Sequence, residues 1–254
     1  MDFEIEGKWE PLSKNYRVFV TKAHTFTTDT ILLANFAAPK SKDACADFGT
    51  GCGMIPLIWK SKFSPKSVVG IEIQEQAAWQ AQKSVLENGF SDTIKILHAD
   101  AKDIKKIAKH AEFSLIACNP PYKAIGAGIK NSEKNRIVAR HEESFALEDL
   151  AKSAAFSLKF GGRLCICQRP ERLADAMTIF RANGLEPKRL RLVQQREEKA
   201  PFLFLLESKR GGAVGMQIEP TLIIEDEKGL PSAEINEIYG EYRDGASFSD
   251  REEI

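Results

Sequence analysis

Short apolar runs alternate with longer segments of mixed polarity through the middle of the chain. Runs at residues 45–47, 68–73, 93–100 and 113–118 are bounded by small or charged residues, as buried strands usually are. Residues 75–88 are rich in alanine and glutamine and lack glycine and proline, so they predict a helix between the second and third runs. Because strand and helix alternate, we expect a parallel sheet with helices on both faces.

The alternation continues in the second half of the chain. There the pattern predicts a helix at about 144–158, a strand at 161–168, a further helix, and strands at 188–195 and 201–208. Pro170 suits the first position of that further helix, and Gly184 suits its end. The sequence therefore predicts an α/β fold of the Rossmann-like kind, built on a seven-stranded, mostly parallel sheet.

The ends of the chain predict additions to this core. Residues 16–21 are expected to be extended and residues 27–36 to form a capped helix, so residues 1–40 read as an N-terminal extension that packs on the core. The core domain is expected at residues 41–210. Residues 211–254 are expected to hold a small hairpin at 211–224 and a polar, flexible tail.

Composition narrows the classes of protein that fit this pattern. The chain has 254 residues, of which 43% are hydrophobic, and its 36 basic residues balance 36 acidic ones. A global field that would attract nucleic acid is therefore excluded, and any RNA must bind to local patches. The five cysteines show no zinc spacing, and no run of 18 apolar residues or signal peptide occurs. We expect a cytoplasmic protein without metal, membrane span or disulfides.

A glycine-rich turn follows the first predicted strand, with the sequence Asp47-Phe-Gly49-Thr-Gly51-Cys-Gly53. A dinucleotide site would instead read G-x-G-x-x-G and direct a helix N-terminus at a pyrophosphate. A carboxylate ahead of the glycines suits a cationic ligand that carries an amino acid. We interpret Glu72, at the end of the second strand, as a partner of ribose hydroxyls, and Asp100, after the third, as a partner of an adenine amine.

The string Asn119-Pro120-Pro121-Tyr122 ends the fourth predicted strand, where ligands bind in such sheets. An exocyclic amine such as the adenine N6 is a poor nucleophile because its lone pair is delocalised. The Asn119 side-chain oxygen and the Pro120 carbonyl can each accept one amine N–H and turn the lone pair toward a methyl donor. Tyr122 can stack on the base, which is typically worth about 1–3 kcal/mol. The string alone is also compatible with a simple turn.

These motifs resemble those of the class I S-adenosylmethionine-dependent methyltransferases, and the Asn-Pro-Pro-Tyr string resembles the signature of their amino-group branch. The similarity is to the bacterial tRNA(Val) adenine-37 N6-methyltransferases and covers roughly Tyr16 to Tyr239. The strings that carry it are Phe26-Thr-Thr-Asp29-Thr-Ile-Leu-Leu-Ala, Gly51-Cys-Gly-Met-Ile-Pro-Leu, Ile71-Glu-Ile-Gln, Ala139-Arg-His141-Glu and Arg169-Pro-Glu-Arg-Leu. The residues after Gly240 match no pattern of this family.

The resemblance implies the cofactor S-adenosyl-L-methionine and a tRNA substrate that is modified at the exocyclic nitrogen of the adenine 3′ of the anticodon. It also implies a role for each matching residue. Asp47, Gly49 and Gly51 would hold the methionine part of the cofactor, Glu72 its ribose and Asp100 its adenine. Asn119, Pro120 and Tyr122 would hold the target base, with Asn119 also beside the cofactor. Thr27 and Asp29 would either close over the donor or simply cap a helix.

Basic residues near the predicted site are candidates for contact with RNA phosphates. Lys123, Arg136, Arg140 and His141 follow the Asn-Pro-Pro-Tyr string, in a stretch that is expected to be a loop. A second basic set lies on or beside a late strand and comprises Lys188, Arg189, Arg191 and Arg196. The lysines at 102–109 are expected to form a solvated helix face, and His141 is equally compatible with a helix start outside any cleft.

Two other enzymatic functions and one non-enzymatic function are compatible with these motifs. A glutamine side-chain amide is also planar and conjugated, so the same string suits a protein glutamine N5-methyltransferase that acts on a release factor. Such enzymes usually carry a helical domain before the glycine loop, whereas 46 residues precede Asp47 here. A DNA or other RNA adenine N6-methyltransferase is a further alternative. A binding module that has lost transfer would not need Asn119 and Tyr122.

Overall fold

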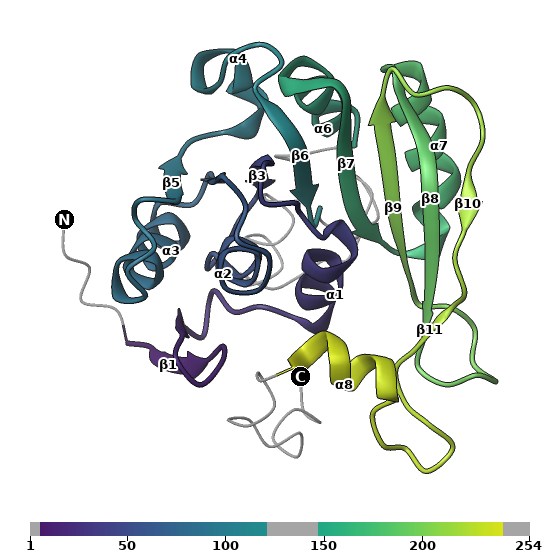
Figure 1. The fold of residues 1–254 in the computed structure, drawn as a ribbon, viewed down its shortest axis with the longest axis horizontal. Coiled ribbons are helices and arrows are strands. Elements are labelled where there is room, and N and C mark those ends of the chain that lie inside the picture. Colours follow the sequence, from purple (N-terminus) through teal and green to yellow (C-terminus); the bar gives the residue numbers. More distant parts are fainter. Residues whose placement is uncertain (1–5, 121–146, 241–254) are drawn as a thin grey trace, which may run out of the picture.

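A nine-stranded sheet runs through the part of the chain that the structure describes, residues 6–120 and 147–240 of a computed structural model (Figure 1). Its order is β10-β8-β9-β7-β6-β3-β4-β5, and β11 also pairs with β8. The strands are β3 Ala44–Phe48, β4 Ser67–Glu72, β5 Ile94–His98, β6 Phe113–Cys118, β7 Leu158–Gln168, β8 Leu185–Gln194, β9 Leu203–Arg210, β10 Gln217–Ile218 and β11 Leu222–Ile223. The seven predicted strands are thus confirmed, and two strands of two residues each extend the sheet.

All pairings from β5 to β7 are parallel, while β9 runs antiparallel to both of its neighbours, β7 and β8. In Figure 1 β6 therefore points down and β9 points up. The strand order reverses between the adjacent strands β3 and β6. From β3 the chain proceeds to β4 on one side, and from β6 it proceeds to β7 on the other. Such a reversal opens a crevice at the carboxyl ends of the central strands.

Helices cover both faces of the sheet, as predicted. Their bounds are α1 Thr28–Ala37, α2 Met54–Ile58, the π-helix η1 Trp59–Phe63, α3 Glu75–Glu87, the 3-10 helix η2 Ala101–Asp103, α4 Ile104–Ile107, α6 Leu147–Ser157, the 3-10 helix η3 Pro170–Arg172, α7 Leu173–Ala182 and α8 Ala233–Tyr239. Side chains of α1, α2 and α3 pack in one hydrophobic cluster, and those of α4, α6 and α7 pack in a second. No helix of the described residues is long and apolar enough to cross a membrane.

The alternation of side chains along β7 divides the two hydrophobic clusters. Leu164 and Ile166 face the cluster under α6 and α7, whereas Cys165 and Cys167 face the cluster under α1 and α2. All four side chains are fully buried. A strand buried on both faces reads as a continuous apolar run, which is why the sequence showed the strand without showing which face each residue meets.

The N-terminal residues form a separate two-stranded sheet that the sequence did not predict as a pair. It consists of β1 (Lys8–Pro11) and β2 (Arg17–Val20), which are antiparallel. Buried polar groups attach it to α3, because Gln80 Nε2 donates to the Phe19 carbonyl oxygen at 2.7 Å and the Ser84 hydroxyl accepts from the Phe19 N–H at 2.9 Å. The extension thus lies against the helix that follows β4.

The hairpin predicted for residues 211–224 is wrong. Both β10 and β11 pair with β8, each in parallel, and do not pair with each other. Edge strand β8 presents free backbone groups that the following chain can satisfy more simply than by folding on itself. The residues of the expected polar tail from 241 onward lie outside the described residues.

An ionic cluster ties the last turn of α1 to the sheet. The Glu207 carboxylate on β9 accepts hydrogen bonds from Arg163 at 3.0 Å and from Arg189 at 3.1 Å. The same two guanidinium groups donate to the carbonyl oxygens of Ala37 at 3.0 Å and Phe36 at 2.6 Å, which lie in the last turn of α1. Glu207 therefore holds together two cations that in turn satisfy the end of a helix.

We expect Glu207→Ala to lower the free energy of unfolding by about 2–3 kcal/mol, because it leaves two mostly buried guanidinium groups without their shared carboxylate. Urea denaturation measures this loss. Glu234→Ala is the matched control, since Glu234 pairs with Arg191 but is 47% exposed, and we expect it to cost less than about 1 kcal/mol. Equal losses in the two variants would contradict a structural role for the cluster.

Candidate active site at the carboxyl ends of β3, β4 and β6

The register of three central strands brings the predicted site residues to one edge of the sheet. Phe48 of β3 is aligned with Ile71 of β4 on one side and with Cys118 of β6 on the other. Glu72 is the last residue of β4, and Asn119 follows directly after β6. The glycine loop, Glu72 and Asn119 therefore begin at the same level of the sheet, as their positions after predicted strands indicated.

The glycine loop makes a tight turn that only glycine adopts easily. Gly49, Gly51 and Gly53 have φ angles of 75°, 54° and 86°. A Cβ atom on Gly49 or Gly51 would meet no atom within 4 Å, whereas one on Gly53 would lie 3.0 Å from the Ala81 Cβ. The first two glycines leave open space for a ligand, and the third allows α2 to approach α3.

Asp47 is buried at the end of β3, 1% exposed. Its Oδ2 accepts a hydrogen bond from the Thr50 hydroxyl at 2.6 Å, while its Oδ1 has no partner among the described residues. Burial raises the pKa of Asp47 to about 7; the Thr50 hydrogen bond opposes this shift and the charge of Glu72 adds to it. A buried carboxylate oxygen without a donor costs stability, and it is suited to receive a cationic group from a ligand.

Glu72 is also buried, at 4% exposed, but its carboxylate is held by backbone donors. Its Oε2 accepts from the Gly51 N–H at 2.8 Å and its Oε1 from the Gln74 N–H at 2.9 Å. These bonds leave each oxygen with one further lone pair, which is the requirement for accepting bonds from a pair of ribose hydroxyls. The bond to Gly51 also fixes the shape of the glycine loop.

Asp100 and the start of α1 flank this centre. Asp100 is half-buried and caps η2, because its Oδ1 accepts from the Lys102 N–H at 2.9 Å. Thr27 precedes α1 and is exposed, and its side chain makes no capping hydrogen bond. Asp29 lies buried in the first turn of α1. The capping role considered for Thr27 is therefore not observed, and contact of Thr27, Asp29 or Asp100 with a cofactor stays a prediction.

Asn119 meets a residue that the sequence did not associate with the site. The Cys167 thiol, on the neighbouring strand β7, donates to Asn119 Oδ1 at 3.2 Å. Asn119 is half-buried, Pro120 and Cys167 are buried, and Cys167 is fully inaccessible. Because a thiol is only a weak donor, Oδ1 keeps acceptor capacity for a substrate N–H. The spacing of 48 residues between the two positions carries no local signal that would have revealed this contact.

Several predicted residues are not placed by the structure. Tyr122, Lys123, Arg136, Arg140 and His141 all lie outside the described residues. Of the second basic set, Arg191 pairs with Glu234 at 2.6 Å and Arg196 with Glu225 at 2.8 Å. Arg189 belongs to the Glu207 cluster, and Lys188 donates to the carbonyl oxygen of Ala213 at 2.9 Å. The second set is thus engaged with this chain's own acceptors.

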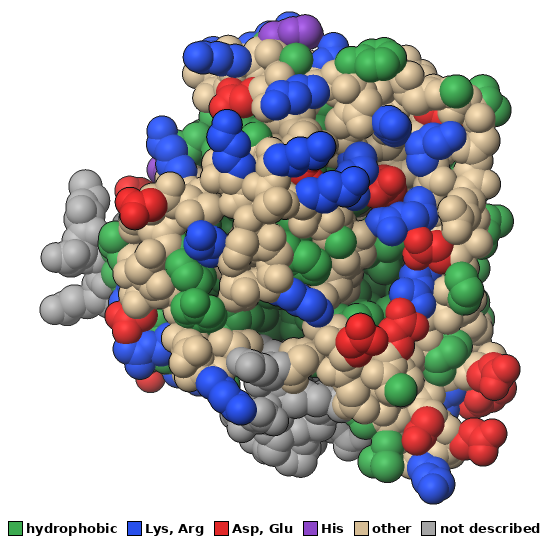
Figure 2. All heavy atoms as spheres, in the orientation of Figure 1, with side chains coloured by type: hydrophobic (Ala, Val, Ile, Leu, Met, Phe, Trp, Pro, Cys, Tyr) green, Lys and Arg blue, Asp and Glu red, His purple; other side chains and the backbone are tan. Residues whose placement is uncertain are grey.

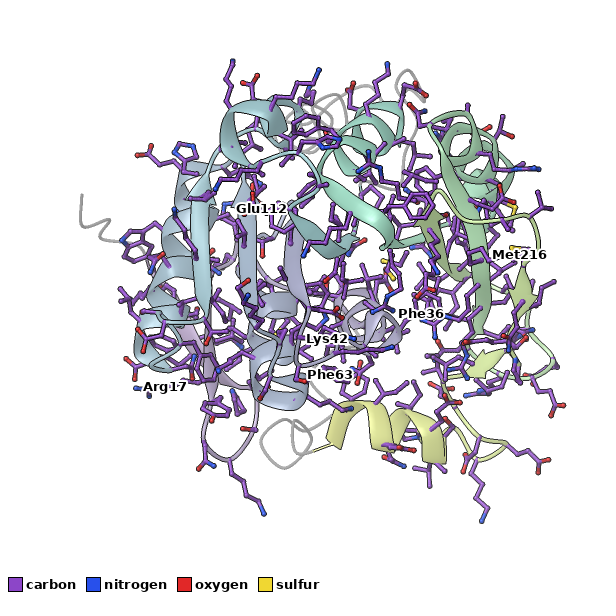
Figure 3. All side chains as sticks on the ribbon, turned by 45° about the horizontal axis from the view of Figure 1, so that its top comes forward. Arg17, Phe36, Lys42, Phe63, Glu112 and Met216 are labelled. Atoms are coloured by element: carbon purple, nitrogen blue, oxygen red, sulfur yellow. The ribbon has the colours of Figure 1, made fainter. Side chains whose placement is uncertain are left out.

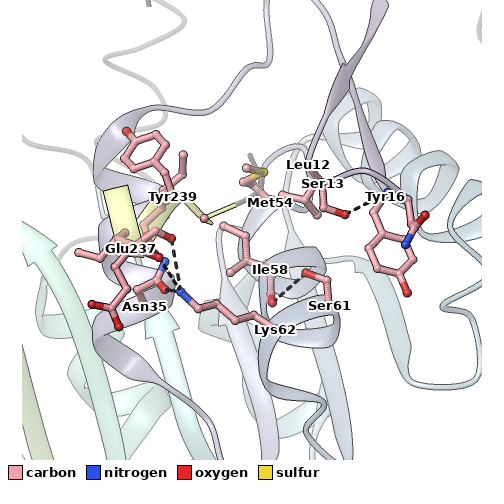
Figure 4. Close-up of a pocket in the computed structure, with 14 residues that line it drawn as sticks. Leu12, Ser13, Tyr16, Asn35, Met54, Ile58, Ser61, Lys62, Glu237 and Tyr239 are labelled. Atoms are coloured by element: carbon pink, nitrogen blue, oxygen red, sulfur yellow. Dashed lines mark hydrogen bonds between the residues drawn. The ribbon is translucent and has the colours of Figure 1, made fainter. Parts of the chain in front are cut away.

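A cavity of about 330 Å³ lies beside this region, between α1, α2, η1, α8 and the turn of β1 and β2 (Figure 4). None of the predicted cofactor or base residues lines it. Lys62 extends into it and donates to Asn35 Oδ1 at 2.6 Å and to the Ile238 carbonyl oxygen at 3.4 Å. Burial lowers the pKa of Lys62, partly opposed by Glu237. The cavity therefore lies between α8 and α1, and the predicted methyl-transfer residues do not line it.

The strand order, the glycine loop and the acids at consecutive strand ends define a class I methyltransferase. Solved structures agree on the fold: a predicted O-methyltransferase from Agrobacterium tumefaciens superposes with a TM-score of 0.68 at 19% identity, covering 85% of this chain and 97% of its own. Residues 13–177 match the family model described as the methyltransferase small domain. These likenesses establish the class without specifying a substrate.

Curated relatives are more specific. A protein of Porphyromonas gingivalis named tRNA1(Val) (adenine(37)-N6)-methyltransferase is 32% identical over 216 residues, covering 82% of this chain and 84% of the relative. A protein of the same name from Pedobacter heparinus is 35% identical over 141 residues, covering 56% of this chain and 58% of the relative. This chain belongs to the tRNA1(Val) (adenine(37)-N6)-methyltransferase family, as its motifs indicated.

The raised pKa of Asp47 predicts a pH-dependent stability. Because the folded protein holds this proton up to a pH of about 7 and the unfolded chain releases it near its ordinary value of 3.8, stability falls as the pH rises between these values. We expect this residue to contribute a loss of up to about 4 kcal/mol, at 1.36 kcal/mol per pKa unit. Unfolding of the ligand-free protein and of Asp47→Asn, compared from pH 4 to pH 8, isolates this contribution. A pH-independent difference between them would refute the raised pKa.

Proposed function

We propose that this protein transfers a methyl group from S-adenosyl-L-methionine to the exocyclic N6 of an adenine in tRNA, namely adenine 37 of tRNA(Val), the position in its relatives' names. The observation that carries the proposal is that Asn119 and Pro120 follow the end of β6, and that β6 pairs with β3, the strand that contains Asp47. Ala117 of β6 is aligned with Asp47 of β3, so the acceptor pair begins two residues beyond the predicted cofactor carboxylate. We also propose that the reaction takes place in the cytoplasm.

The residues of the glycine loop fit the proposed cofactor. The partnerless Asp47 Oδ1 suits a ligand ammonium group, and the open space over Gly49 and Gly51 admits a ligand close to the backbone. Glu72 is preset by two backbone donors to accept from ribose hydroxyls. Asp100, two residues after β5, is the proposed partner of the cofactor's adenine. When bound, S-adenosyl-L-methionine supplies an electrophilic methyl group on a sulfonium.

The protein's own contribution to transfer is to hold the amine in a reactive shape. Asn119 Oδ1 and the Pro120 carbonyl oxygen each accept one N–H of the substrate amine, which draws both hydrogens to one side and exposes the lone pair. The backbone nitrogens at 120 and 121 carry no hydrogen, because both residues are prolines. Alignment of the lone pair with the methyl group then lowers the barrier without a strong base. Tyr122 is the proposed stacking partner of the base.

Incubation with labelled S-adenosyl-L-methionine and unmodified total tRNA, followed by nucleoside mass spectrometry, tests the proposal. We expect N6-methyladenosine confined to tRNA(Val), and we expect Asn119→Ala to lower the rate at least 100-fold while its affinity for the cofactor stays within about two-fold. A release-factor protein serves as the parallel substrate. Label in the release factor alone would favour the glutamine methyltransferase, and loss of cofactor affinity in Asn119→Ala would refute the division of roles.

The contact between Cys167 and Asn119 predicts a smaller effect on the same step. Cys167→Ala removes the thiol donor that orients the Asn119 amide, so we expect kcat to fall about 2- to 10-fold, the equivalent of one modest hydrogen bond. Cys167→Ser retains a donor and should restore most of the rate. Cys165→Ala is the matched control, because Cys165 is equally buried on the same face of β7 but contacts Glu207. Equal losses in both alanine variants would indicate a packing effect.

A further inference from the structure

The loops at the opposite edge of the sheet, where the parallel strands begin, are rich in cations. We call this surface the amino-edge surface. Its members come from the loops before β3, β4 and β6, from α4, from the start of β7 and from the end of β9: Lys40, Lys42, Lys66, Lys105, Lys109, Lys159, Lys209 and Arg210. All are exposed except Arg210, which is half-buried. Figure 2 shows Lys and Arg gathered over the upper half of the molecule, which is this edge.

Side-chain and backbone contacts join these loops into one surface. Arg210 Nη2 lies 3.2 Å from His110 Nε2, and the ring of His110 packs edge-on against Phe156 at 5.4 Å between centroids. Lys105 Nζ lies 5.7 Å from the centroid of the same Phe156 ring. On the other side, the Lys66 N–H donates to the Asp43 carbonyl oxygen at 3.0 Å.

The buried polar contacts of β3 and β6 complete the surface. Ser114 of β6 donates to Asp43 Oδ1 at 2.9 Å, and Asp43 Oδ2 accepts from the Lys40 N–H at 2.8 Å. The loop before β3 and the start of β6 are thereby tied to the carboxylate of Asp43, and the loop before β4 is tied to the backbone carbonyl of the same residue. Figure 3 turns this edge toward the reader and labels Lys42 and Glu112 on it.

Most cations of these loops are not paired with a carboxylate; Lys106 of α4 pairs with Asp103 at 2.9 Å and is therefore not counted in the surface. Asp43 is buried, and the guanidinium of Arg163 lies 3.7 Å away. The Glu112 carboxylate accepts a hydrogen bond from the backbone N–H of Lys109. Glu186 of β8 pairs with Arg181 at 3.1 Å. Within the described part of the chain, none of the eight cations forms an ion pair with a carboxylate. The chain is neutral as a whole, but at this edge eight cations without an ion-pair partner among the described residues lie on one surface.

An exposed aromatic ring stands among these cations. Phe160, next to Lys159, is 83% exposed, the largest exposed fraction among the described large hydrophobic side chains. It packs against Gly211, where a Cβ atom would clash with the Phe160 ring. An apolar ring that is exposed to water beside a glycine in the turn after β9 gains little from folding. Cations around an exposed aromatic ring are the combination with which proteins bind nucleic-acid backbones and stack on bases.

We propose that the amino-edge surface binds the phosphate backbone of the tRNA body outside the anticodon arm, while the anticodon loop lies at the opposite edge. This inference rests on the proposed tRNA substrate. The central strands have five or six residues, so the two edges are about 17–20 Å apart. About six steps of a DNA duplex, at about 3.4 Å each, span this distance. The A-form stems of RNA rise less per step and need a few steps more, so a folded tRNA is long enough to reach both edges.

The triple variant Lys42→Gln, Lys159→Gln and Lys209→Gln tests the inference, because all three lysines are exposed and none is placed in the catalytic machinery. The control is Lys14→Gln, Lys199→Gln and Lys228→Gln, which removes the same charge from exposed positions elsewhere. Binding of each protein to full-length unmodified tRNA(Val) and to its isolated anticodon stem-loop is measured from 50 to 200 mM salt, together with kcat and KM for methylation.

For full-length tRNA we expect the amino-edge variant to bind about ten-fold more weakly and to lose 2–3 units of the slope of log K against log salt, about 0.9 per phosphate contact. Its affinity for the stem-loop and its kcat should be unchanged. Phe160→Ala should weaken full-length binding several-fold. Equal losses in the two triple variants, or a loss confined to the stem-loop, would overturn the inference. If the wild type binds tRNA with this pattern and methylates none, the proposed function fails while the binding surface stands.

Discussion

The pairing of β3 with β4 and β6 is the constraint on which the rest of the structure depends. Parallel backbone hydrogen bonds align Phe48 with both Ile71 and Cys118, and this alignment places the glycine loop, Glu72 and Asn119 at one level. A slip of one residue would turn Asp47 to the opposite face of the sheet. The fully buried core on both faces therefore determines the geometry of the site as well as the stability of the fold.

Two acidic residues, the mostly buried Glu207 and the fully buried Asp47, show how the fold treats charge differently for structure and for function. Glu207 is satisfied by two guanidinium groups that also close the end of α1. Asp47 has one partner and one oxygen without any among the described residues, and its pKa is raised as a result of burial. A group left unsatisfied in this way reduces stability, so its presence beside open glycines favours a binding role over a structural one.

The sequence predicted the central sheet and the carboxylates of the site because both depend on local patterns. Apolar runs mark buried strands, and a residue after a run lies at the strand's end, as Asp47 and Glu72 do. Contacts set by tertiary packing could not be read in this way. Examples are the Cys167 thiol on Asn119, the pairing of β10 and β11 with β8, and the β1–β2 sheet. Exposed-looking arginines such as Arg191 also proved to be paired.

Neutral overall charge is compatible with an RNA substrate only if cations and acids are separated in space. Near the late strands, each arginine of the second basic set is close to a carboxylate, so little field remains there. Among the described residues, the eight cations of the amino-edge surface form no ion pair with a carboxylate, so we expect a local positive potential there although the chain carries no net charge. Electrostatic binding and base recognition are then assigned to opposite edges of one sheet. Such a division favours a large folded substrate that reaches both edges over a short oligonucleotide or an amide side chain.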